Sequence, residues 1–110
     1  MATPLIVTGD DISVAVTLKK NDLTFDIPLL STVTARIVST NHKEVYSGEV
    51  VQSNSTPGAD WPNSLVVVEF APADTNTITY QGKALIEVQV DDNGKRTWFV
   101  TVKLITGQIS

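Results

Sequence analysis

The sequence contains no cysteine and a single histidine, and it has no long apolar run. Without cysteine the chain forms no disulfide and offers no thiol for chemistry. No stretch approaches the roughly 20 apolar residues of a transmembrane helix, and the N-terminus lacks the basic start and long apolar core of a signal peptide. We therefore expect a protein that is made in the cytoplasm, avoids the membrane, and is stabilised by its own core or by a partner surface.

Basic residues are scarce as well. Eight lysines and arginines stand against twelve acidic residues, which gives a net charge of −4. Proteins that bind nucleic acids usually carry a basic patch, so we expect no nucleic-acid partner. The adjacent basic pairs Lys19-Lys20 and Lys95-Arg96 fall at strand ends or turns, where a solvated edge is the ordinary interpretation.

Patterns for catalysis and metal binding are missing too. The sole histidine, His42, lies in a polar turn, and no motif places a nucleophile and an orienting carboxylate beside it, as a catalytic triad requires. No Gly-rich phosphate loop and no zinc-protease motif occurs. The acidic pairs Asp10-Asp11 and Asp91-Asp92 lack the spacing of a calcium loop and are ordinary turn residues. We predict a non-enzymatic protein with no cofactor and no metal ion.

What the sequence does contain is a series of short alternating apolar runs separated by turn residues. No stretch keeps a 3.6-residue period, so almost no helix is expected. The spacing predicts an all-β fold, an antiparallel β-sandwich of jelly-roll or Ig-like type, as one domain over residues 1–110. Residues 1–9 form an extended arm or edge strand, and residues 73–77 a single helical turn. Strands are expected at residues 12–18, 23–27, 33–38, 44–51, 65–71, 83–90 and 96–105, with a bulge or bend at Gly48.

The clearest of these signals is a β-hairpin around Asn93-Gly94. A two-residue loop would set Val88 opposite Phe99 and turn Trp98 away from the apolar face. A three-residue loop over residues 92–94 sets Val88 opposite Trp98 and keeps both on the core side. Gly94 then takes a left-handed conformation, which glycine adopts without steric cost. We predict the three-residue loop.

Three groups of apolar residues are candidates for a partner interface. Leu85, Phe99 and Ile105 lie on the face of the hairpin opposite the predicted core, and a monomer seldom leaves such a patch in water. Trp61 lies in the longest polar loop, residues 52–64, where two interpretations stay open. The ring either folds back over one end of the core or anchors a partner. The third group is the N-terminal arm with Leu5, Ile6 and Val7, which pairs at a sheet edge or reaches a neighbour.

The chain has Asp10-Asp11-Ile12 before Val16-Thr17-Leu18, and the pattern continues over residues 23–27, 33–37, 82–90 and 92–105. This order of strands and turns resembles the small β-modules of tailed-bacteriophage virions. Two groups share the layout: head decoration proteins, which staple or cement the capsid, and the N-terminal modules of baseplate upper proteins. The resemblance spans nearly the whole chain and includes no active-site motif.

The resemblance to decoration proteins implies a module that sits on the outer surface of the phage head, often as a homodimer, and clamps subunits of the major capsid protein. Many copies on a symmetric lattice would multiply a modest interface energy. A decoration protein fits a stand-alone chain of this length better than a baseplate module does. The alternatives are a tail baseplate or fibre attachment module and a carbohydrate-binding module, for which only Trp61, Tyr46 and Tyr80 are candidate platform residues.

Overall fold

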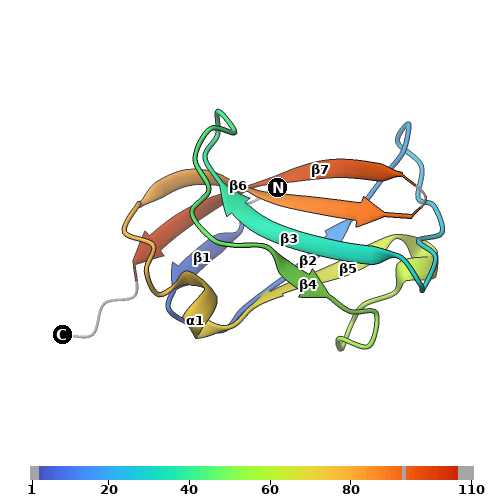
Figure 1. Cartoon of the computed structure of the whole chain (residues 1–110), viewed down its shortest axis with the longest axis horizontal. Coiled ribbons are helices and arrows are strands. Elements are labelled where there is room, and N and C mark those ends of the chain that lie inside the picture. Colours follow the sequence, from blue (N-terminus) through green and yellow to red (C-terminus); the bar gives the residue numbers. More distant parts are fainter. Residues whose placement is uncertain (1–2, 93, 107–110) are drawn as a thin grey trace.

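Strands dominate the part of the chain that the computed structural model describes, residues 3–92 and 94–106 (Figure 1). The expected all-β class with almost no helix is confirmed. Each strand is short and bounded by turns, as the alternating apolar pattern predicts. In chain order the elements are β1 (Leu5–Thr8), β2 (Ile12–Thr17), β3 (Thr32–Val38), β4 (Val50–Gln52), the 3-10 turn η1 (Trp61–Asn63), β5 (Leu65–Phe70), the one-turn helix α1 (Pro72–Thr75), β6 (Gly82–Asp91) and β7 (Lys95–Thr106).

The described strands form a five-stranded sheet in the order β1-β7-β6-β3-β4 and a two-stranded sheet of β2 and β5. Four strand pairs are antiparallel, as expected. The fifth pair, β1 with β7, is parallel, with Leu5 beside Lys103 and Val7 beside Ile105. The expectation of a wholly antiparallel arrangement is therefore wrong at this edge. No hairpin turn joins the first strand to the last, so nothing in the chain imposes an antiparallel direction there.

The register of the β6–β7 hairpin agrees with the parity argument. Val88 lies opposite Trp98, and Asp91 lies opposite Lys95, so the loop has three residues, 92–94. Gly94 has φ +143°, a conformation that strains other residues. The predicted three-residue loop is confirmed; the conformation of its central residue lies outside the described part of the chain.

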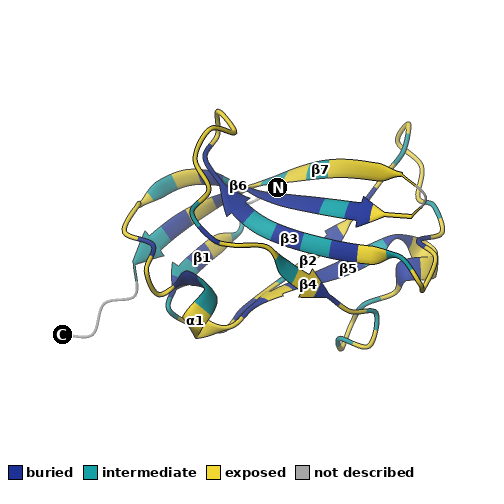
Figure 2. Ribbon diagram, viewed as in Figure 1, coloured by how far each residue is buried: buried dark blue, intermediate teal, exposed yellow. Residues whose placement is uncertain are grey.

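The apolar core lies between the two sheets (Figure 2). The inward faces of β6 and β7 supply Val88 and Val102, and β5 supplies Val66 and Phe70, all buried. Burial of such side chains contributes about 1.5–3 kcal/mol each, which makes this face the main source of stability in a chain without disulfides. Trp98 shares the inward face but is half-buried, because it lies where the two sheets end.

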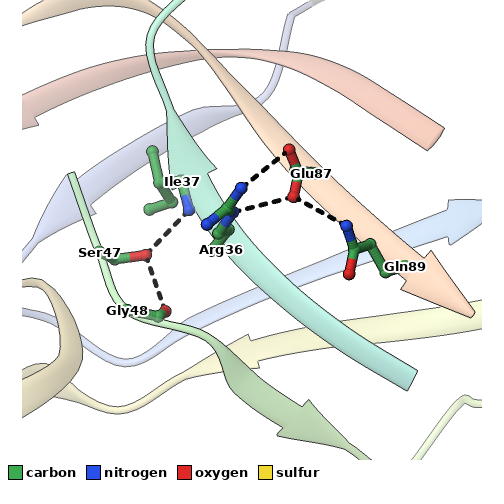
Figure 3. A network of polar contacts seen from close by, with 6 residues as sticks. All are labelled: Arg36, Ile37, Ser47, Gly48, Glu87 and Gln89. Carbon is green, nitrogen blue, oxygen red and sulfur yellow. Dashed lines mark hydrogen bonds and ion pairs between the residues drawn. The ribbon is translucent and has the colours of Figure 1, made fainter. Parts of the chain in front are cut away.

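The segment after β3 departs from the expected strand over residues 44–51. Val45 makes a single bridge to Val38, and regular pairing resumes only at β4. The reason is Ser47, whose hydroxyl accepts the Ile37 N–H at 2.9 Å (Figure 3). The N–H groups of Tyr46 and Ser47 both donate to the Ile37 carbonyl, so two residues oppose one. This is the pattern of a β-bulge, at residues 46–47 rather than at Gly48.

Gln52, the last residue of β4, ties the two sheets together. Its carboxamide oxygen accepts the Glu69 N–H at 2.8 Å, and its amide nitrogen donates to the Glu69 carbonyl at 3.1 Å. The side chain thus satisfies both backbone groups of one β5 residue, as a neighbouring strand would. Gln52 is buried, so loss of this bridge would leave polar groups without a partner.

Candidate partner-binding surfaces

The outer face of the β6–β7 hairpin is only partly open. Phe99 is 44% exposed, whereas Leu85 and Ile105 are half-buried. The ring of His42 meets the Phe99 ring edge-on at 4.4 Å between centroids. Because β6 lies between β3 and β7, the turn that carries His42 must cross the outer side of β6 to make this contact. Part of the patch that a partner was expected to cover is therefore covered by the chain itself.

A charged pair lies in the middle of the same face. The Arg36 Nε donates to the Glu87 carboxylate at 2.8 Å, and the Gln89 amide approaches it at 3.4 Å (Figure 3). Glu87 is only 7% exposed, although it points away from the core. A buried carboxylate needs such partners, because desolvation would otherwise disfavour its charge. The face is therefore a mixture of apolar and paired polar groups.

Alternate residues of the N-terminal arm face opposite sides of the sheet. Ile6 is buried against the core, whereas Leu5 is 58% exposed and Val7 is half-buried on the outer side. The pairing of β1 with β7 corresponds to the edge-strand interpretation of the arm. Ile6 does not point outward in this arrangement, so within the arm only Leu5 and Val7 are placed to meet a partner.

Trp61 lies inside the molecule, with 3% of its surface exposed. Its backbone N–H donates to the Asn54 side-chain oxygen at 3.0 Å, and its backbone carbonyl accepts the N–H groups of Ile27 and Ser64, each at 2.9 Å. The polar loop thus folds back and uses its tryptophan to close one end of the core. The interpretation of Trp61 as a partner anchor is therefore wrong, because its ring is buried and has almost no exposed surface.

Three exposed leucines lie instead on the connection between β2 and β3, residues 18–31. Leu23 is 70% exposed, Leu29 59% and Leu30 100%. This connection lies at the end of the molecule that also carries the β6–β7 turn, on the right in Figure 1. Sequence reasoning missed these residues, because the alternation at residues 23–27 was interpreted as a strand. The available signal was Pro28 followed by two leucines in a turn.

The connection is not a strand because its backbone bonds elsewhere. Leu23 makes only one bridge, to Lys20, around a two-residue turn in which Asn21 and Asp22 have φ +52° and +64°. Two such left-handed residues define the tight turn typical of hairpins. Farther along, the Ile27 N–H donates to the Trp61 carbonyl. The expected strand at residues 23–27 is therefore absent from the described structure.

Aromatic contacts fix the connection against β7. The Phe25 ring stacks on Trp98 at 5.5 Å between centroids, and the Lys20 ammonium lies 4.4 Å from the Phe25 centroid. The Trp98 Nε1–H donates to the Lys19 carbonyl at 2.9 Å. Such stacked and cation–π contacts are worth about 0.5–1.5 kcal/mol each. The loop that exposes the leucines is thus held in place before any partner arrives.

The remaining aromatic pair is Tyr46 and Tyr80, whose rings stack at 4.8 Å between centroids. Partial burial and the carboxylate of Glu44 raise the pKa of the Tyr46 phenol above its ordinary value. Each ring uses one face for the other, and Trp61 is buried, so the side chains considered for a sugar platform do not form one together.

Acidic side chains line a groove of about 640 Å³ beside Gln52, among them Asp11, Glu69 and Asp74. Within residues 3–92 and 94–106, no three His, Asp or Glu side chains come together in a way that could hold a metal ion. No helix in that part of the chain is long and apolar enough to cross a membrane.

No protein-family model, curated protein or solved structure matches the chain.

Proposed function

We propose that the chain is a non-enzymatic binding module with an Ig-like β-sandwich fold. In Ig domains the sheet that contains the last two strands also contains the third, and the second strand pairs with a later one in the opposite sheet. The order β7-β6-β3-β4 opposite β2-β5 agrees with that arrangement. The connection 18–31 and the turn 92–94 then correspond to loops at one end of the sandwich, the loops with which variable domains bind partners.

One observation carries this proposal: three leucines stand exposed on a connection that is fixed in advance. Leu23, Leu29 and Leu30 are 59–100% exposed. Each would contribute up to about 1.5–3 kcal/mol if a partner removed it from water. The Phe25–Trp98 stack holds the connection in place, so less conformational entropy is lost on binding. Binding sites placed on loops of a rigid scaffold are the usual arrangement in such folds.

The partner that we propose is the major capsid protein of a tailed bacteriophage. In this role the chain is a decoration protein on the outer surface of the head, present in many copies, often as dimers, that clamp neighbouring coat subunits. This proposal extends the resemblance of the strand and turn pattern, and the exposed leucines support it by offering an apolar contact surface. Attachment to a baseplate or fibre is the alternative that the same surface would serve.

The test is the location of the chain in the virion. Particles of the phage that encodes it are separated into heads and tails, and the chain is quantified in each fraction. Enrichment in heads, at many copies per particle, supports the decoration role. Enrichment in tails overturns it in favour of the baseplate alternative, and absence from both fractions overturns a virion role altogether.

A variant test identifies the surface. The triple variant Leu23→Ser, Leu29→Ser, Leu30→Ser should lose binding to heads that lack the chain. The matched control is Val51→Ser, which changes a 72% exposed apolar residue on β4, outside the connection. Equal binding by the triple variant and the control would show that the leucines do not contribute to the interface.

A further inference from the structure

The two basic pairs of the sequence are far apart in the chain, but three of their four residues meet at one hollow. Lys19 and Lys20 follow β2, and Arg96 lies near the start of β7. Together with Asn21, Thr97 and Trp98 they line a depression of about 470 Å³. The solvated-edge interpretation treated each pair alone. Three cations around one hollow are unexpected in a chain of net charge −4.

The cations are positioned by the contacts that fix the connection 18–31. Arg96 shares a face of β7 with Trp98, because alternate residues of a strand point the same way. The indole of Trp98 bonds to the Lys19 carbonyl, and Lys20 lies over Phe25, which stacks on Trp98. Trp98 thus holds the backbone at Lys19 and the ring under Lys20, and it lies on the same face of β7 as Arg96.

No carboxylate among the described residues forms an ion pair with these cations. The ion pair found in that part of the chain joins Arg36 to Glu87 on the outer face of the sheet. Asp26 and Asp92 line a smaller hollow beside Lys20 and Arg96 without reaching ion-pair distance. The lining of the larger hollow thus contains three cations and no carboxylate, and none of the three is held in an ion pair.

Beside the hollow lies an open edge of the five-stranded sheet. β1 covers only residues 103–106 of β7. The Lys103 N–H points to that edge, since it donates to the Pro4 carbonyl at 2.9 Å. Alternation then directs the backbone groups of Thr97, Phe99 and Thr101 to the same edge, where no other described strand lies. Figure 2 shows this half of β7 largely exposed.

We propose that the edge of β7 and the basic hollow together bind an extended acidic segment of a partner protein. An added strand would bond to the backbone of Thr97, Phe99 and Thr101, as in β-strand addition. Its carboxylates would meet Lys19, Lys20 and Arg96 in charge-assisted hydrogen bonds. A free backbone edge selects a polypeptide over a nucleic acid, because only a polypeptide can add a strand to it.

This inference deepens the proposed function and rests on it, because it names the chemistry of the segment that the binding end would take. The inference and the proposed function can be overturned by different results. Binding to phage heads without binding to an acidic peptide overturns only the inference. Binding to an acidic peptide by a chain that is absent from virions overturns only the proposed function.

The test is a titration of the isolated chain, followed by the amide resonances of residues 95–102 and by Trp98 fluorescence. The probe is a capped peptide of alternating Glu and Thr, and its controls are the same peptide with Gln in place of Glu and a single-stranded oligonucleotide. We expect saturable shifts along the edge with the Glu peptide and at least about tenfold weaker binding of the Gln peptide. No saturable binding, or tighter binding of the oligonucleotide, would overturn the proposal.

Variants distinguish the contribution of the basic side chains to peptide binding from that of the backbone edge of β7. Lys20→Glu with Arg96→Glu should lower affinity for the Glu peptide at least about tenfold, whereas Lys43→Glu with Lys83→Glu, on other parts of the surface, should leave it within about twofold. Thr101→Pro removes an N–H that points to the open edge, at a position where an edge strand tolerates proline, and should abolish binding while far-UV circular dichroism is unchanged. Equal loss in both charge variants, or full binding by Thr101→Pro, would contradict the assignment.

Discussion

Two long connections meet at the same end of the molecule, and both bury apolar residues there, but only one also exposes large ones. Residues 53–60 and η1 form a polar loop that buries its tryptophan, whereas residues 18–31 expose three leucines. Both contribute to the core end, through Trp61 and Ile27, which are joined by a backbone hydrogen bond. Ile27 and Trp61 fill the core at that end, so Leu23, Leu29 and Leu30 lie outside it and stay exposed. Closure by one residue of each connection thus leaves the three leucines of residues 18–31 on the surface.

The strongest test of this comparison removes the closing ring. Trp61→Ala leaves a cavity at the end of the core, and truncation of a buried Trp costs about 3–5 kcal/mol. The free energy of unfolding, measured by urea denaturation, should fall by this amount. Because Ile27 bonds to Trp61, amide exchange in residues 18–31 should also accelerate.

Trp61→Phe is the matched control. It keeps most of the volume and removes the indole N–H, which has no hydrogen-bond partner among the described residues. The loss should therefore be clearly smaller than for alanine. If Trp61→Ala cost less than about 1 kcal/mol, the ring would not be a core residue and the closure argument would fail.

The next largest loss of stability is expected at Gln52, the residue before the polar loop that buries Trp61. Gln52→Ala removes both hydrogen bonds to the backbone of Glu69 and leaves that pair of groups without a protein partner. We expect a loss of about 1–3 kcal/mol in the free energy of unfolding. Gln89→Ala, which removes only a weak contact to Glu87, is the control and should stay within about 0.5 kcal/mol. Equal effects would show that Gln52 does not join the sheets.

A smaller effect is expected where the exposed connection is anchored. Trp98→Phe preserves an aromatic stack on Phe25 and removes the hydrogen bond to the Lys19 carbonyl. Stability should fall by about 1 kcal/mol, and amide exchange at Lys20 and Leu23 should accelerate more than exchange in residues 53–64. Uniform acceleration in both connections would contradict a local anchor.

The sequence predicts the structure correctly where residues close together in the chain determine it. It fails where residues far apart in the chain determine it. The hairpin register follows from parity and from the glycine of its turn, both readable along the chain. The fate of residues 23–27 depends on Trp61 and Trp98, which lie far away in sequence and supply hydrogen bonds and a stacking surface. The bulge at residues 46–47 depends on one serine hydroxyl. The meeting of Lys19, Lys20 and Arg96 is likewise a product of topology.

The smallest expected effect separates a contact surface from a structural one. Leu23→Ser, Leu29→Ser and Leu30→Ser, each made alone, should change the free energy of unfolding by no more than about 0.5 kcal/mol, because exposed side chains lose no packing. Leu30, fully exposed, should show the least change. Thermal unfolding of the three variants beside the parent chain is the measurement. A loss above about 2 kcal/mol at any of them would mean that the leucine packs within the chain in solution. The contrast between the two connections would then disappear, together with the apolar surface on which the proposed function rests.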